Sequence, residues 1–100
     1  MNFETPLDVG FTIYSKSGCD NCTKVKKLLR EKNIFYFEVN CDEYLVEDKE
    51  GFLKFIKDTA KIEYEYKTFP IVFYNSLFFG GYKETKEYFD KLEVNFDGSV

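Results

Sequence analysis

The chain has 100 residues, 44% hydrophobic and 32% charged, a balance that predicts one soluble globular domain with a single modest core. Its net charge of −4 argues against a general nucleic-acid surface, which needs a basic stripe to neutralise phosphates. No apolar run approaches the length of a membrane span, and the first ten residues lack the pattern of a signal peptide. We therefore expect a cytoplasmic protein with neither a membrane nor a nucleic-acid partner.

The first half of the chain predicts a strand, a helix and a second strand. Residues 11–14 (FTIY) alternate and are rich in β-formers, and residues 34–39 (IFYFEV) are aromatic and β-branched. Between them, apolar residues recur at helical spacing from Cys22 to about residue 32. Two such strands need a right-handed crossover, so we expect them to be parallel.

The second half predicts a helix, a hairpin and a last helix. Apolar residues keep helical spacing at about 47–60 and again from 85 to 92, and residues 70–74 and 77–80 form the two arms of a β-hairpin. Residues from about 94 to 100 are expected to form a loose tail.

The predicted order β-α-β-α-β-β-α describes an α/β fold: a four-stranded mixed sheet with helices on both faces, in which the hairpin adds an antiparallel edge. We expect a single domain over residues 1–100, with its core at about 11–92 and short polar extensions at both ends. A monomer is the expected state.

Cys19 and Cys22 form a CxxC pair at the predicted strand-to-helix junction. There the first sulfur lies at the helix N-terminus, where the macrodipole and unpaired N–H groups favour a thiolate. Lys16 and Lys24 add positive charge at the same end. Cys22, one turn into the helix, is expected to be more buried and to attack a mixed disulfide formed on Cys19. The pattern thus predicts a nucleophilic and a resolving cysteine.

A structural disulfide and half of a zinc site are the competing interpretations of the pair. A zinc site would need two more cysteine or histidine ligands, and the chain offers only Cys41 and no histidine, so no metal site is predicted. We expect Cys41 itself to be a partly buried small hydrophobic residue, with a regulatory or dimer-forming thiol as the alternative.

From about Phe11 to Leu92 the chain resembles the glutaredoxins, because several separated features occur in that family's order. They are the strand with Lys16 and the Cys19-Asp20-Asn21-Cys22 motif, the segment Thr68-Phe69-Pro70, and the glycine pair in Phe79-Gly80-Gly81. The resemblance implies a thioredoxin-like fold. It also implies glutathione-dependent reduction of protein disulfides or glutathionylated proteins.

The resemblance also assigns the glutathione-binding residues. Pro70 is expected to be cis, which leaves the backbone of Phe69, after Thr68, free to pair with the extended glutathione. Lys16 and Lys67 are candidates for binding the glycyl carboxylate.

The glycine pair Gly80-Gly81 precedes a helix, so the N–H groups of Tyr82 and Lys83 are expected to hold the γ-glutamyl carboxylate. Glu84 is the expected stand-in for the family's acidic residue, which pairs with the amino group of glutathione.

Asp20 and Asn21 depart from the proline and tyrosine that many dithiol glutaredoxins carry between the cysteines. A carboxylate at Asp20 would oppose thiolate formation if it points inward. In the family, loss of this proline is associated with a [2Fe–2S] cluster held between two subunits with glutathione as co-ligand. A cluster carrier is therefore one alternative function.

A thioredoxin-like electron donor, recycled by thioredoxin reductase and serving ribonucleotide reductase, is another alternative. Against it, no tryptophan precedes the CxxC motif. A binding module that kept the fold and lost the reaction is the last alternative, and the intact cysteine pair argues against it.

Overall fold

The computed structural model describes residues 2–98, and its centre is a four-stranded sheet in the order β2-β1-β3-β4. β1 pairs in parallel with β2 and antiparallel with β3, and β4 completes an antiparallel hairpin with β3. This is the mixed sheet that the sequence predicts. The strands are β1 (Phe11–Ser15), β2 (Tyr36–Asn40), β3 (Ile71–Tyr74) and β4 (Leu77–Gly80).

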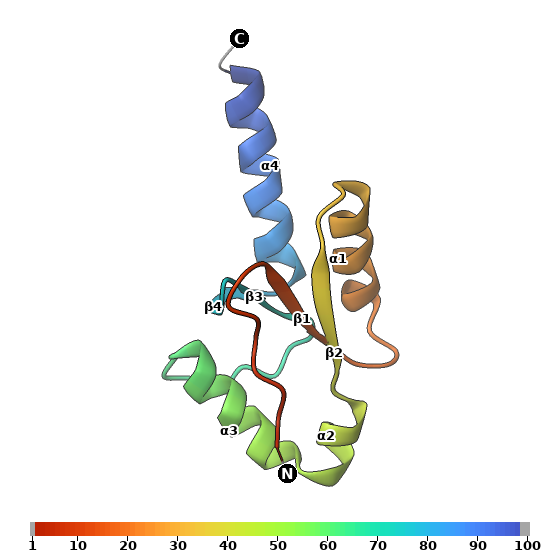
Figure 1. Ribbon diagram of the computed structural model, residues 1–100, viewed down its shortest axis with the longest axis vertical. Helices are drawn as coiled ribbons and strands as arrows, with labels where there is room; N and C mark the ends of the chain where they lie inside the picture. Colours follow the sequence, from red (N-terminus) through yellow and green to blue (C-terminus); the bar gives the residue numbers. More distant parts are fainter. Residues whose placement is uncertain (1, 99–100) are drawn as a thin grey trace.

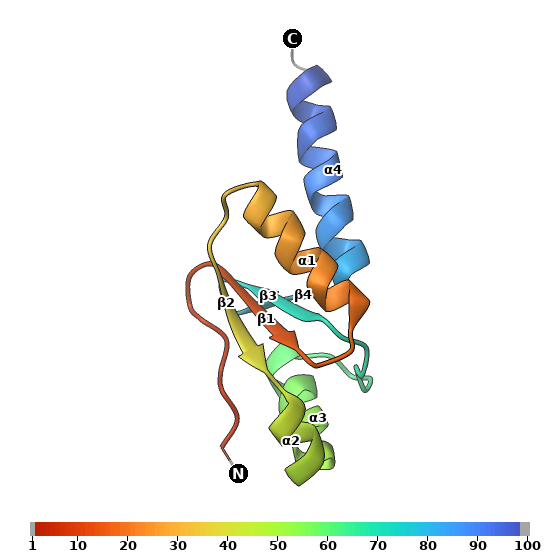
Figure 2. The same ribbon diagram turned by 90° about the vertical axis from the view of Figure 1, so that its right-hand side faces the viewer.

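Helices lie on both faces of the sheet, as predicted (Figures 1 and 2). α1 and α4 cover one face, whereas α2 and α3 lie on the other. They are α1 (Asp20–Glu31), α2 (Asp42–Glu47), α3 (Lys49–Ala60) and α4 (Tyr82–Gly98).

The observed order, β-α-β-α-α-β-β-α, contains one helix that the sequence does not predict. That helix is α2, which has six residues and buries none of them, so it carries no apolar periodicity to detect. Asp48 separates α2 from α3, because its Oδ1 accepts a hydrogen bond from the N–H of Gly51 at 3.0 Å and caps the start of α3.

β1 is one of the two inner strands of the sheet, and all five of its residues are buried. Its side chains alternate between the two faces: Ile13 packs with Val25 and Leu29 of α1, while Tyr14 packs with Phe52 of α3. The end of β1 is therefore fixed from both sides, and the loop that leads to Cys19 begins there.

The last helix is longer than the sequence predicts. α4 continues to Gly98 and projects beyond the body of the molecule (Figure 1), so the expectation of a loose tail is wrong for residues 94–98. Neither proline nor glycine interrupts the chain between Leu92 and Gly98, so nothing in the sequence ends the helix earlier. The rest of the predicted tail, 99–100, lies outside the described residues.

The segment before β1 packs against α2 and α3. The ring of Phe3 contacts Tyr44 and Phe55, with ring centroids 5.0 and 5.4 Å apart. The backbone of Glu4 accepts a hydrogen bond from the Tyr14 hydroxyl at 2.6 Å and donates one to the Tyr44 hydroxyl at 3.0 Å. The segment is thereby anchored over the core.

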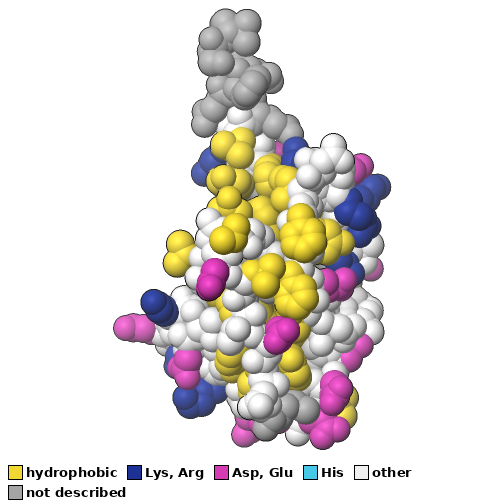
Figure 3. Space-filling model, viewed as in Figure 1, with side chains coloured by type: hydrophobic (Ala, Val, Ile, Leu, Met, Phe, Trp, Pro, Cys, Tyr) yellow, Lys and Arg dark blue, Asp and Glu magenta, His cyan; other side chains and the backbone are white. Residues whose placement is uncertain are grey.

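Apolar side chains gather in a band on the face shown in Figure 3, from α4 down across the sheet. The exposed Tyr74, Tyr88 and Leu92 line a groove of about 260 Å³ between α4 and the sheet. Within residues 2–98, none of the helices has both the length and the apolar character that crossing a membrane requires.

Candidate functional site

Cys19 is the N-cap residue of α1, and Cys22 lies in its first turn. The two sulfurs form a disulfide, with the Cα atoms 5.2 Å apart. Cys19 is partly exposed, whereas Cys22 is only 2% exposed, which matches the burial expected for the pair. The Cys19 Sγ accepts a hydrogen bond from the N–H of Cys22 at 3.1 Å. When the disulfide is reduced, a helix N–H aimed at the sulfur favours the thiolate.

A three-residue loop connects β1 to Cys19. Its Gly18 has a φ of +69°, a left-handed conformation that side-chain-bearing residues rarely adopt. Lys16, at the start of the loop, places its Nζ 5.8 Å from the centre of the Phe69 ring. Lys16 therefore lies beside the Thr68-Phe69-Pro70 segment.

The Phe69–Pro70 peptide bond is cis, as the sequence resemblance implies. Phe69 is buried and stacks on Phe52 of α3, with ring centroids 6.3 Å apart. Cys19 packs against the same core cluster, which also contains Cys22. The cysteine pair and the segment before β3 are thus brought together by a shared part of the core, and Thr68 is exposed next to it.

The glycine pair meets the cis-proline segment at the start of α4. A Cβ built on Gly81 would lie 3.4 Å from the carbonyl oxygen of Pro70 and 3.0 Å from the hydroxyl oxygen of Tyr66. The backbone at Gly81 therefore needs the space that glycine leaves.

Glu84 folds back onto the start of its own helix. Its Oε1 accepts a hydrogen bond from the N–H of Gly81 at 2.7 Å, which is one half of a capping box. Thr85 adds a hydrogen bond from its Oγ1 to the carbonyl oxygen of Gly81 at 2.8 Å. Gly80 has a φ of +124°, and a Cβ there would lie 2.8 Å from the Glu84 side chain. The carboxylate of Glu84 is thus held at the N-terminus of α4 by the N–H of Gly81.

Tyr66 is a member of this region that the sequence analysis does not identify. Its hydroxyl group lies against Gly81, and its ring packs edge-on against Phe78 with centroids 5.0 Å apart. Burial, and then the negative charge of Glu84, raise the pKa of Tyr66. No motif marks this tyrosine, because its contact with the start of α4 depends on the path of the chain before β3.

Two predicted lysines are not joined to the other site residues by any described contact. Lys67 pairs with Glu65 at 3.3 Å, and Lys83 lies 4.0 Å from Glu87 on the next turn of α4; both lysines are exposed. By contrast, Lys24 of α1 lies over the Tyr82 ring at 6.0 Å from its centre and so links the N-termini of the two helices.

Cys41 belongs to the same core cluster as Cys22 but is not part of the disulfide. It is fully buried, which is deeper than the sequence predicts, and its Sγ lies 3.6 Å from the carbonyl oxygen of Val39. Burial, and then the nearby charge of Asp42, raise the pKa of the Cys41 thiol to about 12. The packing fits the small hydrophobic role and leaves the thiol unreactive.

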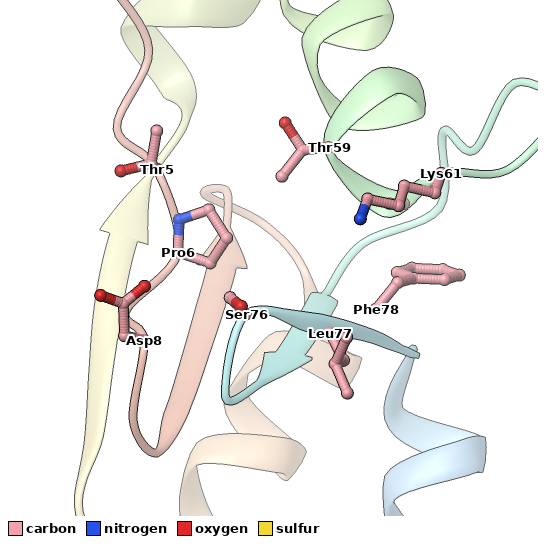
Figure 4. Close-up of a pocket in the computed structure, with 9 residues that line it drawn as sticks. Thr5, Pro6, Asp8, Thr59, Lys61, Ser76, Leu77 and Phe78 are labelled. Carbon is pink, nitrogen blue, oxygen red and sulfur yellow. The ribbon is translucent and has the colours of Figure 1, made fainter.

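Two other observations limit where a ligand could bind. Among the side chains that the structure describes, those of residues 2–92, no three from His, Cys, Asp or Glu are grouped so that they could hold a metal ion. A pocket of about 330 Å³ (Figure 4) is lined by the N-terminal segment, the end of α3 and the β3–β4 turn, with Lys61 reaching toward its centre. None of the predicted site residues lines that pocket.

Comparison with known sequences gives a family match. The glutaredoxin family model matches residues 11–79 of this chain. The chain is 38% identical over 69 residues to glutaredoxin 1 of Rickettsia felis, an alignment that covers 69% of this chain and 61% of that protein. This chain thus spans less than two thirds of the length of that relative.

Solved structures give the same result. The chain matches the crystal structure of glutaredoxin 1 from Francisella tularensis, complexed with cacodylate, with a TM-score of 0.70 and 27% identity over 84% of this chain and 95% of that one. It also matches a dithiolic glutaredoxin of Trypanosoma brucei brucei with a TM-score of 0.64 and 26% identity, over 90% and 84% of the two chains. The chain belongs to the glutaredoxin family.

Proposed function

We propose that this protein is a glutathione-dependent thiol–disulfide oxidoreductase in which Cys19 is the nucleophile and Cys22 the resolving thiol. The observation that carries the proposal is the geometry of the pair. The sulfur of the partly exposed Cys19 caps α1 and accepts a hydrogen bond from the Cys22 N–H at 3.1 Å, while Cys22 is buried beside it. This arrangement supports a thiolate at neutral pH on the cysteine that a substrate can reach.

The reaction begins when the Cys19 thiolate attacks the glutathione sulfur of a glutathionylated protein. The protein–glutathione S–S bond breaks, a Cys19–glutathione disulfide forms, and the protein thiolate leaves and takes up a proton from water. A second glutathione thiolate then attacks the adduct, which releases glutathione disulfide and restores the Cys19 thiolate. Overall, the protein–glutathione disulfide is reduced to the protein thiol, and one free glutathione thiol is consumed as glutathione disulfide forms.

Protein disulfides follow a second route that uses Cys22. Cys19 first forms a mixed disulfide with the substrate, and the Cys22 thiolate then attacks the Cys19 sulfur, so that the substrate leaves fully reduced. The product is the Cys19–Cys22 disulfide, the form that the structure contains. Two glutathione molecules return it to the dithiol and leave as glutathione disulfide.

The proposed glutathione site runs from Lys16 to the start of α4. The backbone of Phe69 would pair with the peptide, and the N–H groups of Tyr82 and Lys83 in the first turn of α4 would bind the γ-glutamyl carboxylate. Glu84 supports this site because its carboxylate is held in place by Gly81 and can face an amino group.

For the glycyl carboxylate, Lys16 has more support than Lys67. Lys16 lies over Phe69, whereas Lys67 is paired with Glu65. Thr68, exposed beside them, completes the proposed site.

The test is reduction of a small glutathione mixed disulfide, coupled to glutathione reductase and NADPH, for the wild type, Cys19→Ser and Cys22→Ser. We expect the wild type to be active, Cys19→Ser to be inactive and Cys22→Ser to retain activity, because the first route needs only Cys19. An inactive wild type that turns over with thioredoxin reductase would instead support a thioredoxin-like donor, for which ribonucleotide reductase is the partner to try first.

A [2Fe–2S] cluster is not part of this proposal. The described residues of one chain do not form a group of three metal ligands, and Cys19 is the one accessible sulfur of the CxxC pair. A shared cluster would have to draw its other ligands from glutathione and a second chain. Binding of such a cluster stays a prediction. An absorbance spectrum without cluster bands after anaerobic reconstitution would contradict it.

A further inference from the structure

The loop that carries Cys19 is held by a residue far away in the sequence. Asp42, the first residue of α2, accepts a hydrogen bond from the backbone N–H of Ser17 through Oδ1 at 2.8 Å. Its second oxygen, Oδ2, accepts a hydrogen bond from the Ser17 hydroxyl. Figure 1 shows the β1–α1 loop beside the start of α2. One carboxylate therefore fixes both the backbone and the side chain of the same loop residue.

Asp42 is itself held in place. Its N–H donates to Oδ1 of Asn40 at 2.9 Å, and the N–H of Cys41 donates to the carbonyl oxygen of Ser15 at 2.8 Å. The backbone that leads into Asp42 is thus tied to the ends of β1 and β2. Because its own backbone is fixed, the carboxylate of Asp42 can determine where the loop lies.

The path from Ser17 to Cys19 is short. Gly18 follows Ser17, and a Cβ built there would meet nothing within 4 Å. On the far side, the helix holds Cys19 through the bond from the Cys22 N–H to its Sγ. A single glycine therefore separates the residue that Asp42 binds from the nucleophile.

The ionisation of Asp42 fits this role. The two hydrogen bonds from Ser17, and then the positive charge of Lys16, hold the pKa of the Asp42 carboxyl below its ordinary value. The carboxylate is therefore ionised, and able to accept both bonds, throughout the neutral range. The charge also faces Lys16, which leads from β1 into the loop.

We propose that Asp42 is a positioning residue of the thiol-exchange site, which holds Ser17 and through it sets the placement of Lys16 and Cys19. Asp42 touches no substrate, and its contribution is the geometry of the loop. The inference rests on the proposed function for its effect on turnover, but its effect on the loop and on Cys19 can be measured without glutathione.

Asp42→Asn and Asp42→Ala separate position from charge. Asn keeps an oxygen for the Ser17 N–H and offers an amide N–H to the Ser17 hydroxyl, so the loop stays held although the charge is lost. Ala removes the charge and both hydrogen bonds. Asp48→Ala is the matched control, because Asp48 also accepts a backbone N–H at a helix start, that of Gly51, but does not touch the loop.

Three quantities are measured well below the melting temperature of every variant. They are the hydrogen-exchange rate of the Ser17 amide, the rate at which iodoacetamide alkylates Cys19 in the reduced protein, and kcat/KM for the small glutathione mixed disulfide. For Asp42→Ala we expect exchange to be about tenfold faster and kcat/KM about tenfold lower, as when a charge-assisted hydrogen bond is lost. We also expect a changed alkylation rate. Asp42→Asn and Asp48→Ala should stay within about threefold of the wild type in all three.

The other outcomes contradict the proposal in distinct ways. If Asp42→Ala behaves like Asp48→Ala, Asp42 contributes only to stability. If Asp42→Asn changes the three quantities as much as Asp42→Ala does, then the negative charge of Asp42 is responsible and its hold on the loop is not. An inactive wild type would refute the glutathione-dependent function, and exchange and alkylation would then decide the positioning role by themselves.

Discussion

Replacing Glu84 by alanine should destabilise the protein by a predictable amount. The change removes the 2.7 Å hydrogen bond between Oε1 and the Gly81 N–H at the start of α4. Loss of a side-chain bond at a helix N-terminus costs about 0.5–2 kcal/mol, and because Glu84 is exposed we take about 1 kcal/mol. For a domain of this size, that lowers the melting temperature by about 4–8 °C.

Glutamine at the same position separates capping from charge. Glu84→Gln keeps an acceptor oxygen for the Gly81 N–H, and capping boxes use Gln as well as Glu, so we expect less than half of the fall seen for alanine. Both variants lose the negative charge proposed to face the amino group of glutathione. An exposed ion pair is worth about 0.2–1 kcal/mol, which corresponds to a rise of up to about fivefold in the KM for glutathione.

Thermal unfolding followed by circular dichroism and the KM for glutathione are the two assays. Glu87→Ala is the control, since Glu87 lies on the same helix near Lys83 at 4.0 Å and does not cap it. The reasoning about the cap is refuted if Glu84→Ala and Glu87→Ala have the same melting temperature. The reasoning about the charge is refuted if Glu84→Gln leaves the KM unchanged.

Three further predictions address other parts of the molecule. Gly80→Ala should destabilise by about 1–3 kcal/mol in thermal unfolding, because it adds a Cβ 2.8 Å from the Glu84 side chain at a φ of +124°; an unchanged melting curve would show that the turn tolerates it. Phe3→Ala should cost about 2 kcal/mol in urea denaturation, since its half-buried ring packs on α2 and α3, and should leave kcat/KM unchanged; a loss of activity would connect the N-terminal segment to the site. Burial raises the pKa of the Cys41 thiol to about 12 and also raises that of the Tyr14 hydroxyl, so the folded state keeps protons that the unfolded chain releases. Their stabilising contribution is complete below about pH 9 and is lost as the pH rises toward 12, so the urea midpoint should fall over that range, less steeply in Cys41→Ala than in the wild type.

The features that the sequence predicts correctly are local ones. Alternation in residues 11–14 and the apolar run after Cys22 place the CxxC pair between a strand and a helix, and the structure has Cys19 as the cap of α1. The glycine pair likewise precedes α4. In each case a short run of residues determines its own local structure. Its place in the fold can therefore be predicted without knowing which distant residues it contacts.

The features that the sequence does not reveal depend on contacts between distant segments. Ser17 and Asp42 are 25 residues apart, and neither belongs to a recognised motif. Tyr66 meets Gly81 only because of the path taken before β3. α2 escapes prediction for a different reason, since a short helix with no buried residue leaves no periodic apolar pattern.

The most direct test of the central claim is to find which sulfur accepts glutathione. Reduced Cys22→Ser is mixed with glutathione disulfide, and mass spectrometry of the intact protein and of its peptides locates the adduct. Serine at position 22 cannot resolve the mixed disulfide, so we expect one glutathione per chain, attached to Cys19. An unmodified protein, or an adduct on Cys41, would contradict the assignment of Cys19 as the nucleophile.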